Sequence, residues 1–237
     1  MKKKWLLRVT APLILCGSTM FGAPCVSGTL QSYINLGVTG CTVGGVDYSA
    51  FAIVPGQNGA TQINPNSITV TPGGTQYLTM LLLTLNQTAN PGTLLESIFR
   101  VRTAGLLTGA SVTLGSPVVT GDGAATGILD VCAGGMFAGT APTGCSATAG
   151  STAAFAIAGG PNQLFDSVAF APNSFFDIFF DISVDGGASG SAVLSSATLG
   201  VNAAPEPSAI LFVAAGIGAI GFLRLRRNKI NQSSGDN

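Results

Sequence analysis

Charged side chains are scarce in this sequence, and histidine is absent from it altogether. Asp, Glu, Lys and Arg make up 8% of its 237 residues, whereas they make up about a quarter of an average soluble protein. Without histidine, the chain lacks the most common general base and a frequent metal ligand. Lysine and arginine are concentrated at the two ends, so residues 28–204 contain two bases against eight acids. An acidic middle of this kind excludes nucleic-acid binding through a basic surface.

Long segments of helical periodicity are also missing between residues 25 and 204. Short runs rich in Val, Ile, Thr and Phe are separated there by Gly, Pro, Asn and Asp. This pattern predicts one all-β domain, an antiparallel β-sandwich or jelly roll. One short helix is expected over residues 30–36. The expected strands cover residues 46–54, 67–71, 76–85, 94–103, 111–114, 126–132, 153–158, 164–170, 175–185 and 191–201.

Residues 175–185 support the sharpest strand prediction. Strict alternation places Asp177, Asp181 and Asp185 on one face, in water, and a second set of side chains in the core: Phe176, Ile178, Phe180, Ile182 and Val184. Aspartates four residues apart on a strand are about 13 Å apart, too far to share one Ca²⁺. We therefore expect a solvated acidic face without a metal site. A Ca²⁺ site that combines Asp122 or Asp185 with carbonyl groups of other loops remains an open alternative.

Two further strands carry specific expectations. Residues 78–85 are apolar on both faces, which predicts a central strand covered on each side. In residues 94–103, Glu96, Arg100 and Arg102 share one face. We expect the two arginines to pair with aspartates on neighbouring strands, as exposed ion pairs worth about 0.2–1 kcal/mol each.

No catalytic constellation emerges from the sequence. The middle of the chain has no lysine and no Gly-x-Ser-x-Gly motif, so no serine or cysteine has an evident activating base. Two carboxylates can hydrolyse glycosides, but spacing along the chain selects no pair. We expect neither an enzyme nor a bound cofactor. Polysaccharide binding is the alternative function, although the only tryptophan, Trp5, lies near the N-terminus.

The N-terminus has the features of a secretory signal peptide. Four bases, Lys2, Lys3, Lys4 and Arg8, precede an apolar stretch with small residues over 9–21. Small residues suit cleavage at two places, after Ser18 or after Ser27. The later cut would leave an odd cysteine, so cysteine parity favours the earlier one. We assign residues 1–24 to the signal peptide and residues 25–204 to the exported domain.

Four cysteines of the exported domain are candidates for two disulfides in an oxidising compartment. Cys132 and Cys145 bracket a loop rich in Gly, Ala, Thr and Pro. A bridge closing this loop of about fifteen residues would contribute about 3 kcal/mol. Cys25 and Cys41 are the natural second pair if the signal peptide is cleaved before Cys25.

The C-terminus contains three consecutive features. Pro205, Glu206, Pro207 and Ser208 precede an uncharged apolar run over residues 209–223, and a basic cluster follows: Arg224, Arg226, Arg227 and Lys229. The run would form a helix of about 22 Å, a short transmembrane span. Basic residues after the span place that flank in the cytoplasm, so the exported domain lies outside the inner membrane. Residues 230–237 then form a cytoplasmic tail.

This order of Pro-Glu-Pro, apolar helix and arginine cluster resembles the PEP-CTERM sorting signal of Gram-negative bacteria, a motif also labelled ice-binding protein C-terminal domain. The resemblance covers residues 205–229. It implies export by the Sec machinery, recognition by the membrane protease exosortase near Pro205, and delivery to the cell surface or the exopolysaccharide matrix. The sequence thus predicts an exported protein with a structural or interaction role, and a polysaccharide-binding module as the alternative.

Overall fold

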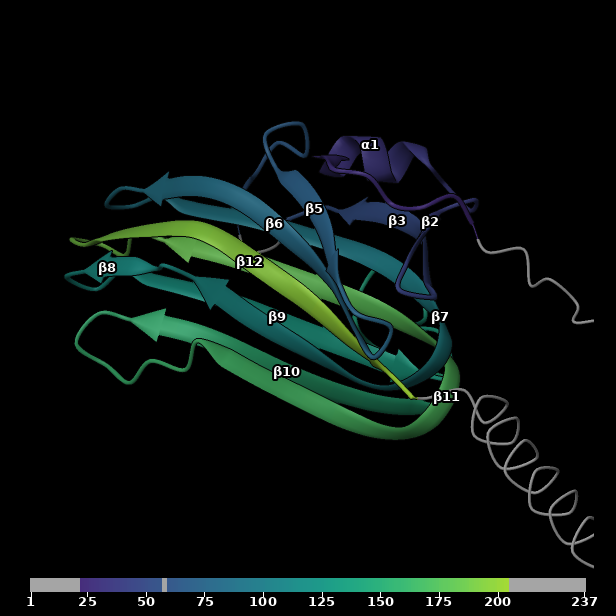
Figure 1. The fold of residues 1–237 in the computed structure, drawn as a ribbon. Helices are drawn as coiled ribbons and strands as arrows, with labels where there is room; N and C mark the ends of the chain where they lie inside the picture. Colours follow the sequence, from purple (N-terminus) through teal and green to yellow (C-terminus); the bar gives the residue numbers. More distant parts are fainter. Residues whose placement is uncertain (1–21, 57–58, 205–237) are drawn as a thin grey trace, which may run out of the picture.

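The structure is a computed structural model that describes residues 22–56 and 59–204 (Figure 1). Most of the predicted signal peptide lies outside the described residues, as do the whole predicted sorting signal, 205–229, and the tail, 230–237. Within the described ranges, no helix is long and apolar enough to cross a membrane. The C-terminal transmembrane helix therefore stays a prediction.

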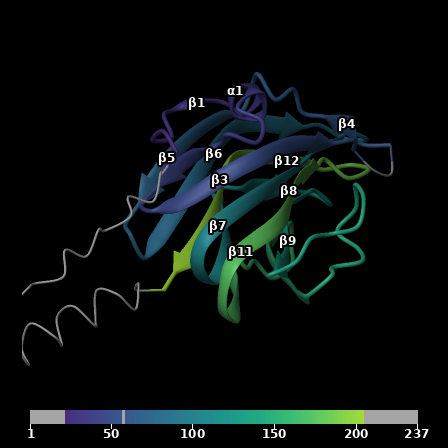
Figure 2. The same cartoon turned by 90° about the vertical axis from the view of Figure 1, so that its right-hand side faces the viewer.

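Antiparallel strands dominate the described part, and one short helix accompanies them. The helix, α1 (Leu30–Asn35), lies beside β1 and β3 at one edge of the fold (Figures 1 and 2). Its N-cap, Thr29, accepts a hydrogen bond from the Ser32 backbone N–H. The strands are β1 (Gly28–Thr29), β2 (Cys41–Val43), β3 (Val46–Val54), β4 (Thr61–Gln62), β5 (Thr69–Gly74), β6 (Leu78–Ala89), β7 (Leu94–Gly115), β8 (Val118–Thr120), β9 (Ala124–Ala133), β10 (Thr148–Ile157), β11 (Phe165–Asp185) and β12 (Ser191–Ala203).

Two layers of strands pack face to face, which confirms the all-β sandwich. The first layer contains β5, β6, β12, the second half of β7 and the first half of β11. The second layer contains β3, the first half of β7, the second half of β11, β9 and β10. All of these pairs are antiparallel, and β4 adds a short parallel pair to β7. One hydrophobic cluster joins the inner faces of both layers, for example Leu83 and Leu199 with Phe180 and Leu129.

The long strands β7 and β11 belong to both layers because each bends in the middle. In β11 the pairing register with β7 shifts around Asn173, directly after Pro172. In β7 the bend falls at Gly105, whose φ of +150° suits glycine. Proline at a strand irregularity costs no ladder hydrogen bond. The sequence predicted two separate strands on either side of each bend, and this was wrong: both positions bend a continuous strand.

The predicted core face of residues 175–185 is confirmed. All five of its apolar side chains are fully buried: Phe176, Ile178, Phe180, Ile182 and Val184. Both predicted disulfides, Cys25–Cys41 and Cys132–Cys145, are also present. The first one ties the start of the domain to β2, where Cys25 N–H also donates to the Thr42 carbonyl at 3.0 Å. Helix 30–36 is confirmed within one residue by α1.

Candidate functional site

Six charged side chains lie together on the outer face of the second layer, which we call the charged face: Glu96, Arg100, Arg102, Asp130, Asp177 and Asp181. Strand alternation points them outward, and the strand register brings them together. Arg102 lies opposite Asp177 across the β7–β11 pair, and Arg100 lies opposite Phe179, which lies opposite Asp130 of β9. The sequence placed Glu96 with the two arginines but did not single out Asp130.

A loop over residues 134–147, which we call the cover loop, packs on the charged face. The Cys132–Cys145 disulfide holds its two ends together. Its Phe137 ring meets Phe179 edge to face, with 5.3 Å between the ring centroids. Phe137, Phe179, Val54, Ile98 and Cys132 form a second buried cluster, separate from the main core. The predicted solvated acidic face is therefore wrong for Asp177, which is only 1% exposed, as is its neighbour Phe179. Asp181 and Asp185 are partly exposed.

The ion pair between Arg100 and Asp177 anchors the cover loop. Arg100 Nε donates to Asp177 Oδ1 at 2.8 Å, and Nη2 donates to Oδ2. Arg100 also donates to the carbonyls of Phe137 (3.1 Å) and Gly139 (2.8 Å), while Phe137 N–H donates to Asp177 Oδ2 (2.9 Å). The hydrogen bond to Asp177 raises the pKa of Arg100. The predicted cross-strand pairing is confirmed for Arg100, but the pair is not exposed as expected, because the loop buries the carboxylate.

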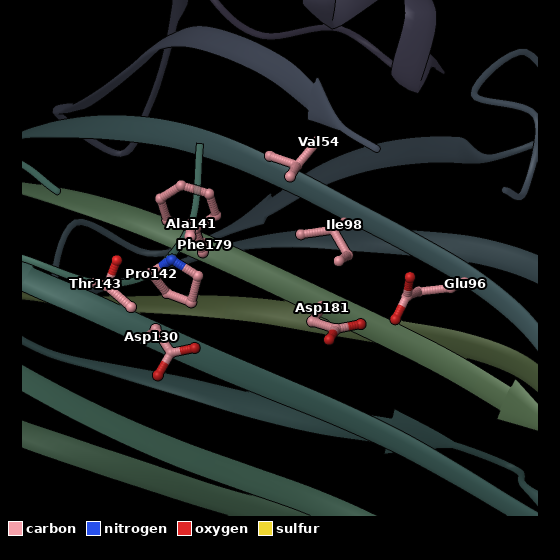
Figure 3. Close-up of a pocket in the computed structure, with 9 residues that line it drawn as sticks. All are labelled: Val54, Glu96, Ile98, Asp130, Ala141, Pro142, Thr143, Phe179 and Asp181. Carbon is pink, nitrogen blue, oxygen red and sulfur yellow. The ribbon is translucent and has the colours of Figure 1, made fainter. Parts of the chain in front are cut away.

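Three carboxylates line a pocket beside the cover loop, the acidic pocket (Figure 3). Asp181 lies between Glu96 and Asp130, each a diagonal neighbour in the strand register, as Figure 3 shows. The pocket has a volume of about 310 Å³. Its other lining residues are Val54, Ile98, Phe179 and the loop residues Ala141, Pro142 and Thr143.

Burial, followed by the nearby charges of Glu96 and Asp130, raises the pKa of Asp181 to about 6. Its Oδ1 atom is buried and accepts no hydrogen bond within the described residues. This carboxyl therefore exchanges its proton near neutral pH and can accept or donate a hydrogen bond accordingly. Among residues 22–56 and 59–204, no three Cys, Asp or Glu side chains converge closely enough to hold one metal ion.

A second depression, the arginine groove, lies beside Met136 near the start of the cover loop, whereas the acidic pocket borders residues 141–143 farther along it. Arg102, Ala104, Met136, Ser174 and Phe175 line it, and its volume is about 320 Å³. Arg102 Nη2 lies 3.3 Å from the Met136 sulfur, and Arg102 Nε has no acceptor within the described part. The predicted pairing with an aspartate is therefore not found for Arg102, because Arg100 takes both oxygens of Asp177.

Asp122 and Asp185 stabilise a turn between β11 and β12. Asp122 accepts hydrogen bonds from the backbone N–H groups of Ala188 (2.8 Å) and Ser189 (2.9 Å), which lower its pKa, the bond from Ser189 contributing most. Asp185 Oδ1 accepts from Gly187 N–H at 2.8 Å. Both carboxylate oxygens of Asp122 and one of Asp185 accept hydrogen bonds within the turn, which gives these residues a structural role.

The outer face of the first layer, which we call the neutral face, has the opposite character. A cross-strand row on it reads Thr71, Leu82, Thr198, Thr113 and Phe165. Among the described residues of β5, β6, β12 and the adjoining parts of β7 and β11, none that points outward there is ionisable. The expectation that 78–85 is covered on both sides was wrong: Leu82 is 38% exposed. Its strand is central in the sheet, but nothing within the described residues packs on its outer face.

Comparisons with known proteins identify no family for this chain. It matches no protein-family model and no curated protein sequence. Among solved structures, one similar chain is the enzymatically active domain of tailspike protein 4 of bacteriophage CBA120 (TM-score 0.26, 11% identity, 62% of this chain and 19% of that one). Another is TmCBM61 in complex with β-1,4-galactotriose (TM-score 0.24, 8% identity), and the match covers 63% of this chain and 86% of that one. The chain thus spans about a fifth of the tailspike structure, and TM-scores this low do not indicate a shared fold.

Proposed function

We propose that this chain is an exported, non-catalytic β-sandwich protein that works outside the cytoplasm as a cell-surface or matrix component. Two disulfides in one compact domain carry this proposal, because such bonds form and persist in oxidising compartments. The proposal agrees with the signal-like N-terminus and with the PEP-CTERM-like segment at residues 205–229. In this proposal, Sec exports the chain and an exosortase cleaves it near Pro205.

Mass spectrometry of the protein recovered from fractionated cells tests this proposal. We expect a mature N-terminus near Cys25, a new C-terminus near Pro205, and two intact disulfides in the surface or matrix fraction. A control chain with Pro205, Glu206 and Pro207 replaced by alanine should keep its disulfides but remain in the membrane fraction. Full-length protein in the cytosol, with reduced thiols and an intact leader, would refute export.

We further propose that the interaction partner of the exported protein is a polysaccharide. Two clefts lie on the charged face beside different parts of a disulfide-bonded loop, and one is acidic while the other presents a guanidinium group. Carboxylates and guanidinium groups bind hydroxyl and acidic groups of sugars through directional hydrogen bonds. Affinity electrophoresis through gels containing neutral or acidic polysaccharides tests this role. Unchanged mobility in all gels would refute polysaccharide binding and leave the structural role as the remaining proposal.

A further inference from the structure

Arg102 is the arginine of the charged face that lacks an ion-pair partner. Within residues 22–56 and 59–204 the only cationic side chains are Arg100 and Arg102. Arg100 donates four hydrogen bonds to Asp177 and the cover loop. Among the described residues, the only hydrogen bond of Arg102 goes to the Met136 sulfur at 3.3 Å, and a thioether is a weak acceptor. Guanidinium groups in proteins normally pair with carboxylates or carbonyls, and Arg102 has neither among the described residues.

The surroundings of Arg102 form a groove that suits a small anionic ring. Met136, Ala104 and Phe175 provide apolar walls, and Ser174 adds an exposed hydroxyl. Met136 is 43% exposed, and the Cys132–Cys145 disulfide closes the loop that carries it. A planar guanidinium group with free N–H groups can bind a carboxylate through two parallel hydrogen bonds. The apolar walls can meanwhile contact the C–H face of a sugar ring.

The acidity of the domain does not prevent anion binding at this position. Glu96 lies six residues away along β7, about 20 Å from Arg102, and Asp130 lies two strands and two residues away, about 12 Å. Both distances exceed the Debye length of about 8 Å at physiological salt. Asp177 faces Arg102 but is paired with Arg100. Asp47, a diagonal neighbour of Arg102 on β3, is the exception, at about 7–8 Å. No cationic side chain pairs with it among the described residues, so its charge weakens anion binding at Arg102.

We propose that the arginine groove binds the carboxylate of a uronic acid within an acidic polysaccharide. Arg102 holds the carboxylate, Ser174 donates to a ring hydroxyl or to the ring oxygen, and Met136 with Phe175 contacts the apolar face of the sugar. This inference rests on the proposed polysaccharide partner and names its chemical class. It does not involve the acidic pocket, which borders residues 141–143 of the cover loop and shares no lining residue with the arginine groove.

Isothermal titration calorimetry of the full disulfide-bonded chain with a galacturonate trimer tests the site. The matched ligand is the methyl ester of the same trimer, which lacks the charges but keeps the ring shape. We expect Arg102→Gln and esterification each to weaken binding by about tenfold to a hundredfold, as for a lost charge-assisted hydrogen-bond pair. Arg102→Lys should retain part of the affinity, and Asp47→Asn should increase it.

Ser167→Asp is the matched control, because it changes the net charge by the same amount as Arg102→Gln but lies on the neutral face. It should bind the trimer like the parent chain, and circular dichroism should show that all variants are folded. Equal binding of the acid and its ester, or equal loss with Ser167→Asp, would refute the site. Equal binding of a tri-glutamate peptide would refute the assignment to sugars. None of these three results would bear on export, which cell fractionation tests separately.

Discussion

Removing the carboxylate of Asp177 should destabilise the protein far more than the loss of a surface ion pair. We consider Asp177→Ala, which deletes the acceptor of three hydrogen bonds, two from Arg100 and one from Phe137 N–H. The Asp177 side chain is 1% exposed, whereas the Arg100 side chain is 20% exposed. After the change, Arg100 can turn partly toward water, but the Phe137 N–H is left buried without an acceptor.

The size of the effect follows from these contacts. Breaking a fully buried pair by removing one partner costs about 3–5 kcal/mol. Because Arg100 can regain some water, we expect the lower end, about 3 kcal/mol, which corresponds to a fall in Tm of about 6–12 °C for a domain of this size. Losing the anchor should also release the cover loop and expose Phe137, so near-ultraviolet circular dichroism should change while the far-ultraviolet spectrum should not.

Urea denaturation of the parent chain, Asp177→Ala, Arg100→Met and the double variant Arg100→Met with Asp177→Leu provides the measurement. The double variant replaces both charges with apolar groups and should recover most of the loss, as in other buried pairs. Asp130→Ala, which removes a partly exposed aspartate of the neighbouring strand β9, serves as the control and should change the stability little. A loss below about 1 kcal/mol for Asp177→Ala would show that the pair behaves as an exposed one, and our interpretation of the cover loop would be wrong.

Three further outcomes follow from the structure. Replacing Cys132 and Cys145 with serine should cost about 3 kcal/mol in the free energy of unfolding by urea; an unchanged midpoint would contradict this. The folded state binds the Asp181 proton more tightly than the unfolded chain, so the stability that this group contributes is full below pH 3.8 and is lost as the pH rises through about 6. Asp181→Asn should therefore gain stability relative to the parent chain between pH 4 and pH 7, and a pH-independent difference would contradict the raised pKa. Phe180→Ala, in the core, should cost about 3–5 kcal/mol and Phe165→Ala, on the neutral face, less than about 1 kcal/mol; similar thermal shifts would mean that the two layers are assigned incorrectly.

Several elements followed from local sequence patterns alone. Alternation over residues 175–185 identified the five buried side chains of the core face, because strand periodicity assigns faces without knowledge of the partner strand. The spacing of the cysteines along the chain, together with the predicted oxidising compartment, indicated both disulfides. The bends in β7 and β11 were not predictable, because Gly105 and Pro172 fit either a chain break or a continuous bent strand. Only pairing with the neighbouring strands distinguishes the two.

The environment of the polar face of residues 175–185 could not be predicted from the sequence. Asp177 and Asp181 alternate with apolar residues, as solvated side chains do, and no local signal shows that the cover loop returns to pack on them. The signal that existed was the Cys132–Cys145 spacing together with Phe137, an aromatic residue inside a loop of small residues. The acidic pocket required two strand registers to bring Glu96 and Asp130 next to Asp181.

By itself, the amino-acid sequence determined the β-class, the core face of residues 175–185, the disulfides and the separation of a charge-poor middle from two basic ends. These properties depend on residue type and on neighbours along the chain. The tertiary structure decided which carboxylates meet, which arginine is paired and which face stays neutral. These outcomes depend on contacts between residues far apart in sequence, such as Arg100 with Asp177, and the register that makes them is set by the packing of whole strands.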